Sequence, residues 1–301
     1  MILVTGGTGF LGGHVLEALY AAKQPVRVLA MGGGDWRSDS LSRLKQMHID
    51  AVVGSILDAR LVSQAVEGCT VIINAAGGLS RRSDADWRHV HVEGLKVLVE
   101  EAQKKGVQRF VQVSCLGAAE QSDCEYFRLK WQGEQIVRNG QFYWTIFRPS
   151  YMFGERCQLV SLLAPLMKLP LATPVIGSGL NEIQPVWVEE VASCILQSIY
   201  KKEAANQVCD LVGPKTYTML QFMELLRSES GSGKPVVAVP VTAVLKMLKP
   251  VGRLVPGLPL DAEFLKLLVC DSCSRSQLMH QLFKVRGVPI DEFLPRILAD
   301  A

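Results

Sequence analysis

Short apolar runs alternate with longer amphipathic stretches along the first half of the chain. The apolar runs are typical of strands buried on both faces of a sheet, and they predict strands at residues 2–5, 26–31, 51–54, 71–75, 109–114 and 142–147. Apolar residues at a spacing of three and four predict helices between them, most clearly at 84–105 and 125–138, with shorter ones at 41–47 and 58–66. Strands that alternate with helices in this way predict an α/β fold with a doubly wound parallel sheet.

Beyond Pro149 the pattern loosens, because proline and glycine become frequent. Strands are still predicted at 183–188 and 208–212, and helices at 158–167, 191–200 and 217–227. We therefore expect a domain at 1–150 built on the sheet. A smaller lobe at 151–301 would form the substrate side or a lid, with a segment at about 183–213 that returns to the sheet.

Composition narrows the class of protein. The 301 residues are 49% hydrophobic and 20% charged, which is typical of a globular chain with a substantial core. A net charge of +3, without a block of lysine and arginine, argues against a nucleic-acid partner. Met1 leads directly into a strand and the eight cysteines are scattered, so we expect a cytoplasmic protein with reduced thiols. Cys270 and Cys273 form one C-x-x-C pair without a second pair at zinc spacing, so no metal site is expected.

The first fifteen residues, MILVTGGTGFLGGHV, contain the most informative motif. A predicted strand breaks into Gly6, Gly9 and Gly12 and passes directly into a helical pattern. Glycines let the backbone approach a phosphate, and the free N–H groups of a helix's first turn point at it. The spacing differs by one residue from the common G-x-G-x-x-G, and a tight turn that only reverses the chain is the alternative.

A second motif follows the fifth predicted strand. Ser114 ends that strand, where a side chain would face the crevice at the carboxyl ends of the strands. Tyr126 and Lys130 lie four residues apart, on one face of a predicted helix. An ammonium beside a phenol would lower its pKa and enable proton transfer to or from a carbonyl or alcohol, while Ser114 could hold the same oxygen. Such Tyr-x-x-x-Lys pairs also occur as ordinary surface features.

Along the chain, five motifs follow one another: TGGTGFLG, NAAG, VSCLGA, the Tyr126 and Lys130 pair, and IFRPSYMFG. The chain resembles the extended and atypical short-chain dehydrogenase/reductases, a group that includes the NAD-dependent epimerases and dehydratases. It is most similar to the NmrA-like and complex-I-accessory-subunit-like branch, through VQRFVQVS, GE and FRPS. This resemblance implies a Rossmann-type NAD(P)-binding domain, and a catalytic set of Ser114, Tyr126 and Lys130.

The resemblance also implies which residues lie along the cofactor. The glycine turn would hold the pyrophosphate, Asp58 would lie near the adenine, and the end of the fourth strand would follow the dinucleotide. The turn after the sixth strand would lie beside the nicotinamide. The expected cofactor residues are Gly6, Thr8, Gly9, Phe10, Leu11, Gly12, Met31, Arg37, Asp58, Asn74, Ala75, Ala76, Gly77, Tyr126, Lys130, Arg148, Pro149 and Ser150.

Two positions depart from the family pattern. Relatives that prefer NAD carry an acid near the end of the second strand, where this chain has Ala30 and Met31. An acid at this position would repel the 2′-phosphate of NADP(H), and this chain lacks one. Arg37 could pair with that phosphate, so NADP(H) is weakly preferred over NAD(H). His91 stands where many relatives have asparagine, which puts their usual proton relay in doubt. Asp58 could instead be only a helix cap, and Arg148 could only stabilise a turn.

Two functions remain open from the sequence. The first is an NAD(P)-dependent oxidoreductase, or an epimerase or dehydratase, acting on an unknown small molecule. The second is a cofactor-holding sensor or structural subunit with little or no turnover. The basic, apolar tail around Lys246, Lys249 and Arg253 could form a lid or rest on a membrane surface. We expect a monomer or a homodimer.

Overall fold

The computed structural model describes residues 1–31, 44, 46–47, 49–77, 87–155, 157, 163, 166–167, 169, 171–231, 233–251 and 262–295, with the backbone alone at 247–251 and 262. The predicted helices at 41–47 and 158–167 lie mostly outside these residues, as do Arg37 and Arg253. Among the described helices, none is both long enough and apolar enough to cross a membrane.

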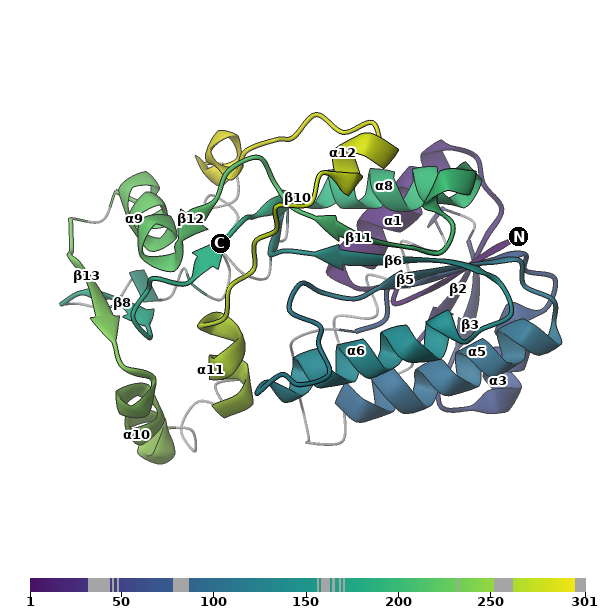
Figure 1. The fold of residues 1–301 in the computed structure, drawn as a ribbon, viewed down its shortest axis with the longest axis horizontal. Coiled ribbons are helices and arrows are strands. Elements are labelled where there is room, and N and C mark those ends of the chain that lie inside the picture. The colour runs from purple at the N-terminus through teal and green to yellow at the C-terminus, as the bar shows by residue number, and fades with distance from the viewer. Residues whose placement is uncertain are drawn as a thin grey trace.

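A seven-stranded sheet forms the larger part of the molecule (Figure 1). Its strand order is β3-β2-β1-β4-β5-β6-β11, and every neighbouring pair is parallel. The order reverses between β1 and β4, so their carboxyl ends open a crevice between them. The strands are β1 (Ile2–Thr5), β2 (Val26–Ala30), β3 (Asp50–Val53), β4 (Val71–Asn74), β5 (Arg109–Val113), β6 (Tyr143–Pro149) and β11 (Gln207–Leu211). The predicted doubly wound sheet is therefore confirmed.

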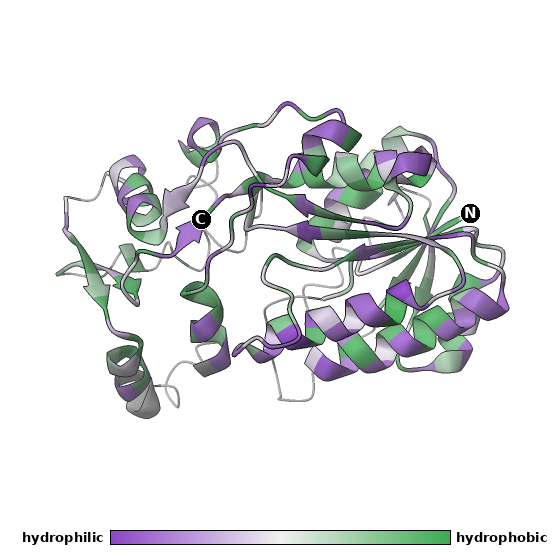
Figure 2. Cartoon of the chain, viewed as in Figure 1, coloured by the Kyte–Doolittle hydropathy of each residue, from purple (hydrophilic) through white to green (hydrophobic). Residues whose placement is uncertain are grey.

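Helices cover both faces of this sheet, which is why its central strands β1, β2 and β4 are largely apolar (Figure 2). Along β1, Leu3 belongs to the core on one face and Val4 to the core on the other. One face is covered by α1 (Phe10–Ala21) and α8 (Val188–Tyr200), which pack against each other. The other face is covered by α3 (Ala59–Val66), α5 (Gly94–Lys104) and α6 (Glu125–Arg138).

The smaller part of the molecule is built from two-stranded sheets and short helices. The strand pairs are β7 (Met152–Phe153) with β10 (Val186–Trp187), β8 (Thr173–Ile176) with β13 (Val236–Val239), and β9 (Glu182–Ile183) with β12 (Tyr217–Thr218). The helices are α9 (Met219–Glu229), α10 (Val241–Val251), α11 (Ala262–Leu268) and α12 (Leu278–Leu282), with 3-10 turns η2 (Lys202–Ala204) and η3 (Ile290–Glu292).

Two predicted elements differ from the structure. The strand expected at 183–188 is interrupted at Pro185 and divides into β9 and β10, which pair outside the main sheet. From this region, β11 is the strand that joins the main sheet, beside β6. The helix expected at 84–105 includes a π-helical turn, η1 (His89–Glu93), before α5. Such turns insert an extra residue into a helix and frequently occur at functional sites.

Candidate functional site

The turn between β1 and α1 is packed so tightly that two of its glycines admit no side chain. Gly6 has a φ of +70°, and a Cβ there would lie 2.4 Å from the carbonyl oxygen of Ala75. A Cβ on Gly12 would lie 2.0 Å from the carbonyl oxygen of Gly6. Gly9 is different, because a Cβ there would meet only the Gly6 oxygen, at 3.2 Å, and Gly9 lines a cavity. Gly6 and Gly12 close the turn, and Gly9 leaves its surface open.

The N-terminus of α1 faces this open surface. No side chain among the described residues caps the helix, and its first turn carries no acidic residue. Phe10, Leu11 and Gly12, whose N–H groups begin the helix, line the same cavity as Gly9. Uncapped N–H groups at the positive end of a helix dipole bind phosphate. The residues present therefore fit the pyrophosphate of a dinucleotide.

The loop after β4 forms the neighbouring edge of the cavity, and Asn74 holds it in place. The Asn74 amide donates to Gln112 Oε1 at 2.8 Å, and its Oδ1 accepts from the backbone N–H of Ala76 at 3.2 Å and from the Thr5 hydroxyl. Asn74 is buried and does not itself line the cavity. Its role here is to position the backbone of Ala76 and Gly77, which do line it.

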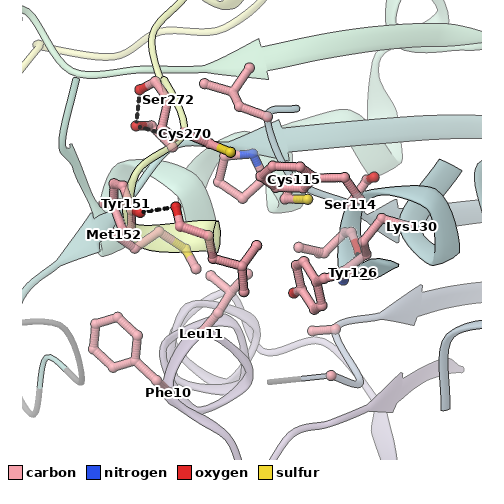
Figure 3. A pocket seen from close by; sticks show the side chains of 18 of the residues that line it. Phe10, Leu11, Ser114, Cys115, Tyr126, Lys130, Tyr151, Met152, Cys270 and Ser272 are labelled. Carbon is pink, nitrogen blue, oxygen red and sulfur yellow. Dashed lines mark hydrogen bonds between the residues drawn. The ribbon is translucent and has the colours of Figure 1, made fainter. Parts of the chain in front are cut away.

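These edges enclose a cavity of about 370 Å³, and most of the expected site residues meet there. In Figure 3, Phe10 and Leu11 enter from α1, Tyr126 and Lys130 from α6, and Met152 from the opposite side. The expected residues that line the cavity are Gly9, Phe10, Leu11, Gly12, Ala75, Ala76, Gly77, Ser114, Tyr126, Lys130, Pro149 and Ser150. Gly6, Thr8, Met31, Asp58, Asn74 and Arg148 lie outside the lining, and Arg37 lies outside the described residues.

Tyr126 and Lys130 lie together on the inner face of α6, as their spacing predicts. Both are buried, and the Lys130 ammonium lies 5.5 Å from the centre of the Tyr126 ring. Lys130 Nζ donates to the carbonyl oxygen of Val113 at 3.2 Å, which holds the ammonium at the end of β5. Within the described part of the chain, the Tyr126 hydroxyl forms no hydrogen bond. A ligand in the cavity can therefore receive its proton.

The pKa values at this site differ from the sequence-based expectation. Burial raises the pKa of Tyr126 well above its ordinary value, so the expected lowering by Lys130 is wrong for this structure. Burial also lowers the pKa of Lys130. The same burial raises the pKa of the neighbouring Cys115 thiol to about 12, which keeps that thiol protonated and unreactive. At neutral pH Tyr126 is consequently a proton donor and not a base.

The Ser114 hydroxyl donates its hydrogen bond within the protein and not to a ligand in the cavity. It donates to Glu134 Oε1 at 2.6 Å, and Glu134 is fully buried. The Arg148 guanidinium donates two further bonds to the same carboxylate, from Nε at 2.7 Å and from Nη2 at 2.6 Å. Arg148 thus pairs with Glu134 at this position and does not reach the cavity. The Glu134 carboxylate joins the ends of β5 and β6 to α6.

His91 lies behind Tyr126 on the π-helical turn η1. Its ring meets the Tyr126 ring edge-on, with 5.4 Å between centroids, and a Cβ on Gly77 would lie 2.6 Å from its Cε1. His91 Nε2 is buried without a hydrogen-bond partner in the described structure. Burial and the nearby Lys130 lower the pKa of His91 well below its ordinary value, so the ring is neutral. His91 therefore packs the tyrosine in place without adding a charge.

The remaining wall comes from the end of the chain. Helix α11 contributes Phe264, Leu267 and Leu268 to the cavity and packs in one hydrophobic cluster with Tyr126. A carboxylate oxygen of Glu263 accepts from the backbone N–H of Glu125 at 2.9 Å, at the first residue of α6. The Tyr151 hydroxyl donates to the Leu267 carbonyl oxygen at 3.1 Å. The first bond attaches α11 to α6, the helix that carries Tyr126, and the second attaches it to the segment after β6.

Sequence reasoning missed Glu134 and all of α11. Glu134 could have been found, because it continues the spacing of four that links Tyr126 and Lys130. Phe264 lies more than a hundred residues further along, in a proline-rich tail without a periodic signal. The C-x-x-C cysteines, Cys270 and Cys273, are free thiols, and the described residues contain no group of three potential metal ligands.

Comparison with known proteins agrees with this geometry. A family model described as NAD(P)H-binding matches residues 6–160, which is just over half of the chain and includes the glycine turn, Tyr126 and Lys130. The chain belongs to this NAD(P)H-binding family. Solved structures of a short-chain dehydrogenase/reductase superfamily protein and of UDP-glucose 4-epimerases share its fold.

Two curated relatives of this NAD(P)H-binding protein illustrate the range of the family. The 40 kDa subunit of mitochondrial NADH-ubiquinone oxidoreductase from Neurospora crassa is 28% identical over 82% of this chain and 64% of its own length. Ceramide reductase from Caulobacter vibrioides is 29% identical over 64% of this chain and 61% of its own length. The chain thus spans less than two thirds of these relatives.

A solved structure shows the same fold with a cofactor present. A short-chain dehydrogenase/reductase superfamily protein from Agrobacterium tumefaciens, crystallised with bound NAD, has a TM-score of 0.73 at 19% identity. The match covers all of this chain and 96% of that one. At this identity the match establishes the fold, and binding of a nicotinamide dinucleotide is supported by the family model and by the open glycine turn.

Asp58 and Met31, two expected cofactor contacts, lie outside the cavity lining. The Asp58 carboxylate accepts from the backbone N–H groups of Arg60 and Leu61, at 3.0 and 3.3 Å, and so caps α3. Met31, directly after β2, is half exposed, and the described end of that strand carries no acid for the ribose hydroxyls.

Proposed function

We propose that this protein is an NAD(P)-dependent oxidoreductase that reduces a carbonyl compound, with Tyr126 as the proton donor. The observation that carries the proposal is the Tyr126 side chain, which lines the cavity: its hydroxyl has no hydrogen-bond partner among the described residues, and its ring lies beside a buried lysine. A bound nicotinamide dinucleotide supplies the hydride in such a reduction.

The chain's own residues account for the movement of the proton. As negative charge grows on the substrate oxygen, Tyr126 gives it the phenolic proton. An alkoxide is a much stronger base than a phenolate, so the transfer is favourable even though burial raises the pKa of Tyr126. Lys130, held by the Val113 carbonyl, stabilises the phenolate left behind. Because Ser114 donates to Glu134, Tyr126 alone carries this step.

NADP(H) is the cofactor that we propose in preference to NAD(H). The support is the exposed Met31 at the position where an acid would repel a 2′-phosphate. Titration with NADPH and NADH, followed by nicotinamide fluorescence and by thermal stability, measures the two dissociation constants directly.

A cofactor-holding subunit or sensor is the second candidate. The neutral His91 that packs behind Tyr126 favours it, since His91 replaces the asparagine of the family's proton relay. The 40 kDa relative is a subunit of a larger oxidoreductase, which also suits this candidate. Cofactor that binds and remains inert toward aldehydes, ketones and quinones would decide in its favour.

The deciding experiment compares Tyr126→Phe with Tyr143→Phe, whose hydroxyl is on the surface. We expect Tyr126→Phe to lower kcat for carbonyl reduction by about a hundredfold or more while the cofactor Kd stays within about twofold. Tyr143→Phe should behave as the unmodified protein. Equal activity of the two variants would disprove the role of Tyr126, and absence of cofactor binding would disprove both candidate functions.

A further inference from the structure

The part of the cavity that lies away from the glycine turn is walled by hydrocarbon, aromatic rings and sulfur. Its side chains come from the segment after β5, from α6, from the segment after β6, and from α11 at the far end of the chain. They include Leu116, Phe127, Met152, Phe264, Leu267 and Leu268. Figure 3 shows part of this lining. A surface of this composition gains free energy when it covers apolar parts of a ligand, at about 25 cal/mol for each Å² removed from water.

The hydroxyl groups in this wall give their protons to the protein. Tyr151 donates to the Leu267 carbonyl at 3.1 Å, and Ser150 donates to the Ser272 carbonyl at 2.6 Å. Ser114 donates to Glu134 at 2.6 Å. A sugar or another polyol needs several donors and acceptors around it, and these hydroxyls offer it few donors. Tyr126 keeps its proton for the cavity, at the reaction centre.

Charged groups are equally sparse in the lining. Among the described residues that line the cavity, Lys130 and Asp271 alone carry charged side chains. Lys130 lies with Tyr126, and Asp271 Oδ1 accepts from the backbone N–H of Glu182 at 2.8 Å. A carboxylate or phosphate on the substrate would therefore lose its water without gaining a cation in the apolar part, which is unfavourable.

We propose that the cavity takes an uncharged, predominantly apolar ketone or quinone, and that it excludes nucleotide sugars and other anionic carbonyl compounds. The proposal rests on the oxidoreductase function proposed above and adds the substrate class. It removes the epimerase and dehydratase variants, because those act on nucleotide sugars. Helix α11 sets this preference, since it contributes three of the apolar side chains that line the cavity.

The test uses two ketones of the same length. 2-Decanone and 9-oxodecanoic acid share a ten-carbon chain and a methyl ketone, and differ by a carboxylate at the far end. With the full chain and saturating cofactor, we expect kcat/KM to be about a hundredfold higher for 2-decanone. 2-Decanone should also raise Tm, whereas 9-oxodecanoic acid and UDP-glucose should leave it unchanged.

A variant that places a cation in the wall makes the test sharper. Met152 is half-buried and enters the cavity from the side opposite Tyr126 (Figure 3), so Met152→Lys can offer an ammonium to the carboxylate. This variant should shift the preference at least tenfold toward 9-oxodecanoic acid. Leu171→Lys, at an 86% exposed position, adds the same charge elsewhere and should leave the preference unchanged.

The outcomes separate this proposal from the proposed function. Reduction or binding of 9-oxodecanoic acid, or binding of UDP-glucose, as efficiently as 2-decanone would overturn the apolar substrate class. An unchanged preference in folded Met152→Lys would also overturn it. If 2-decanone alone raises Tm but is not reduced, the oxidoreductase function fails while the class of ligand is supported. If neither ketone binds nor reacts, the substrate class is wrong.

Discussion

The two halves of the cavity are built in different ways. The half that faces α1 is made of backbone, with glycines and helix N–H groups from the first strand, turn and helix of the chain. The half that faces α11 is made of side chains, which come from segments more than a hundred residues apart. A backbone site depends on a few small residues close together in sequence, whereas a side-chain site depends on how distant segments pack.

This difference explains what each half recognises. A backbone phosphate site binds any dinucleotide of the right shape, and so it can be shared by proteins with different activities. The apolar wall is specific to the packing of α11 and to the residues after β6. Under the proposed function, we therefore expect specificity for the substrate in the apolar half, which the family resemblance describes least.

The largest effect should come from adding one methyl group to the backbone half. A Cβ on Gly12 would lie 2.0 Å from the Gly6 carbonyl oxygen, so Gly12→Ala must displace either the turn or the helix. We expect loss of cofactor binding and a drop of about 3 kcal/mol in the free energy of unfolding.

The neighbouring Gly13 is the matched control, because a Cβ there would meet nothing within 4 Å. Gly13→Ala lies inside α1, where alanine is the better helix former, and should raise stability by about 0.5–1 kcal/mol. Isothermal titration with the cofactor and urea denaturation measure both variants. Similar behaviour of the two would show that the turn is not the close-packed site described here.

The second effect concerns the Glu134 carboxylate, which joins the ends of β5 and β6 to α6. Glu134→Gln removes the negative charge that faces Arg148 in a buried position, and should lower the free energy of unfolding by about 3 kcal/mol. Ser114→Ala removes one neutral donor to the same carboxylate and should cost about 1 kcal/mol. Equal losses in urea denaturation would mean that the ion pair contributes little.

The third effect tests whether α11 belongs to the substrate half alone. Glu263→Ala removes the acceptor for the Glu125 N–H, which should weaken attachment of α11 by about 1 kcal/mol. KM for an apolar ketone should rise by about fivefold, since 1 kcal/mol corresponds to that ratio, while the cofactor Kd stays constant. Glu263→Gln retains an acceptor oxygen and should restore most of the loss. A parallel change in cofactor Kd would show that the two halves are coupled.

The smallest expected effect concerns the pH dependence of kcat. Tyr126 must be protonated to act as a donor, so reduction should fall as the pH rises through its pKa. An unperturbed phenol would lose half of the activity near pH 10. Because burial raises the pKa of Tyr126, kcat should show no loss from this group up to about pH 10. A falling limb near pH 8 that disappears in Tyr126→Phe would contradict the raised pKa.

The sequence predicted most of the sheet and the backbone half, because their signals are local. Gly6, Gly9 and Gly12 lie in one turn, and four-residue spacing places Tyr126 and Lys130 on one face of α6. The orientation of the Ser114 hydroxyl was not predictable, because it depends on a carboxylate twenty residues away and on Arg148 beyond it.

The same reasoning explains the error over the pKa of Tyr126. In the sequence, Lys130 lies one helical turn from Tyr126, and an ammonium at that distance is expected to lower the pKa of a phenol. The structure adds Trp87, His91 and Phe264, which bury the ring from other elements. Desolvation then outweighs the lysine. Burial of this kind is a property of the packed chain and cannot be deduced from the spacing of two residues.

The bonds that attach α11 also bear on how a ligand would leave the cavity. Movement of α11 away from the cavity would break the Glu263 and Tyr151 hydrogen bonds and expose Phe264. Two hydrogen bonds at about 1 kcal/mol each and one buried aromatic ring at about 2 kcal/mol give about 4 kcal/mol. The open form then exists roughly one part in a thousand of the time. An opening of this kind would give a ligand in the apolar half a route out of the cavity.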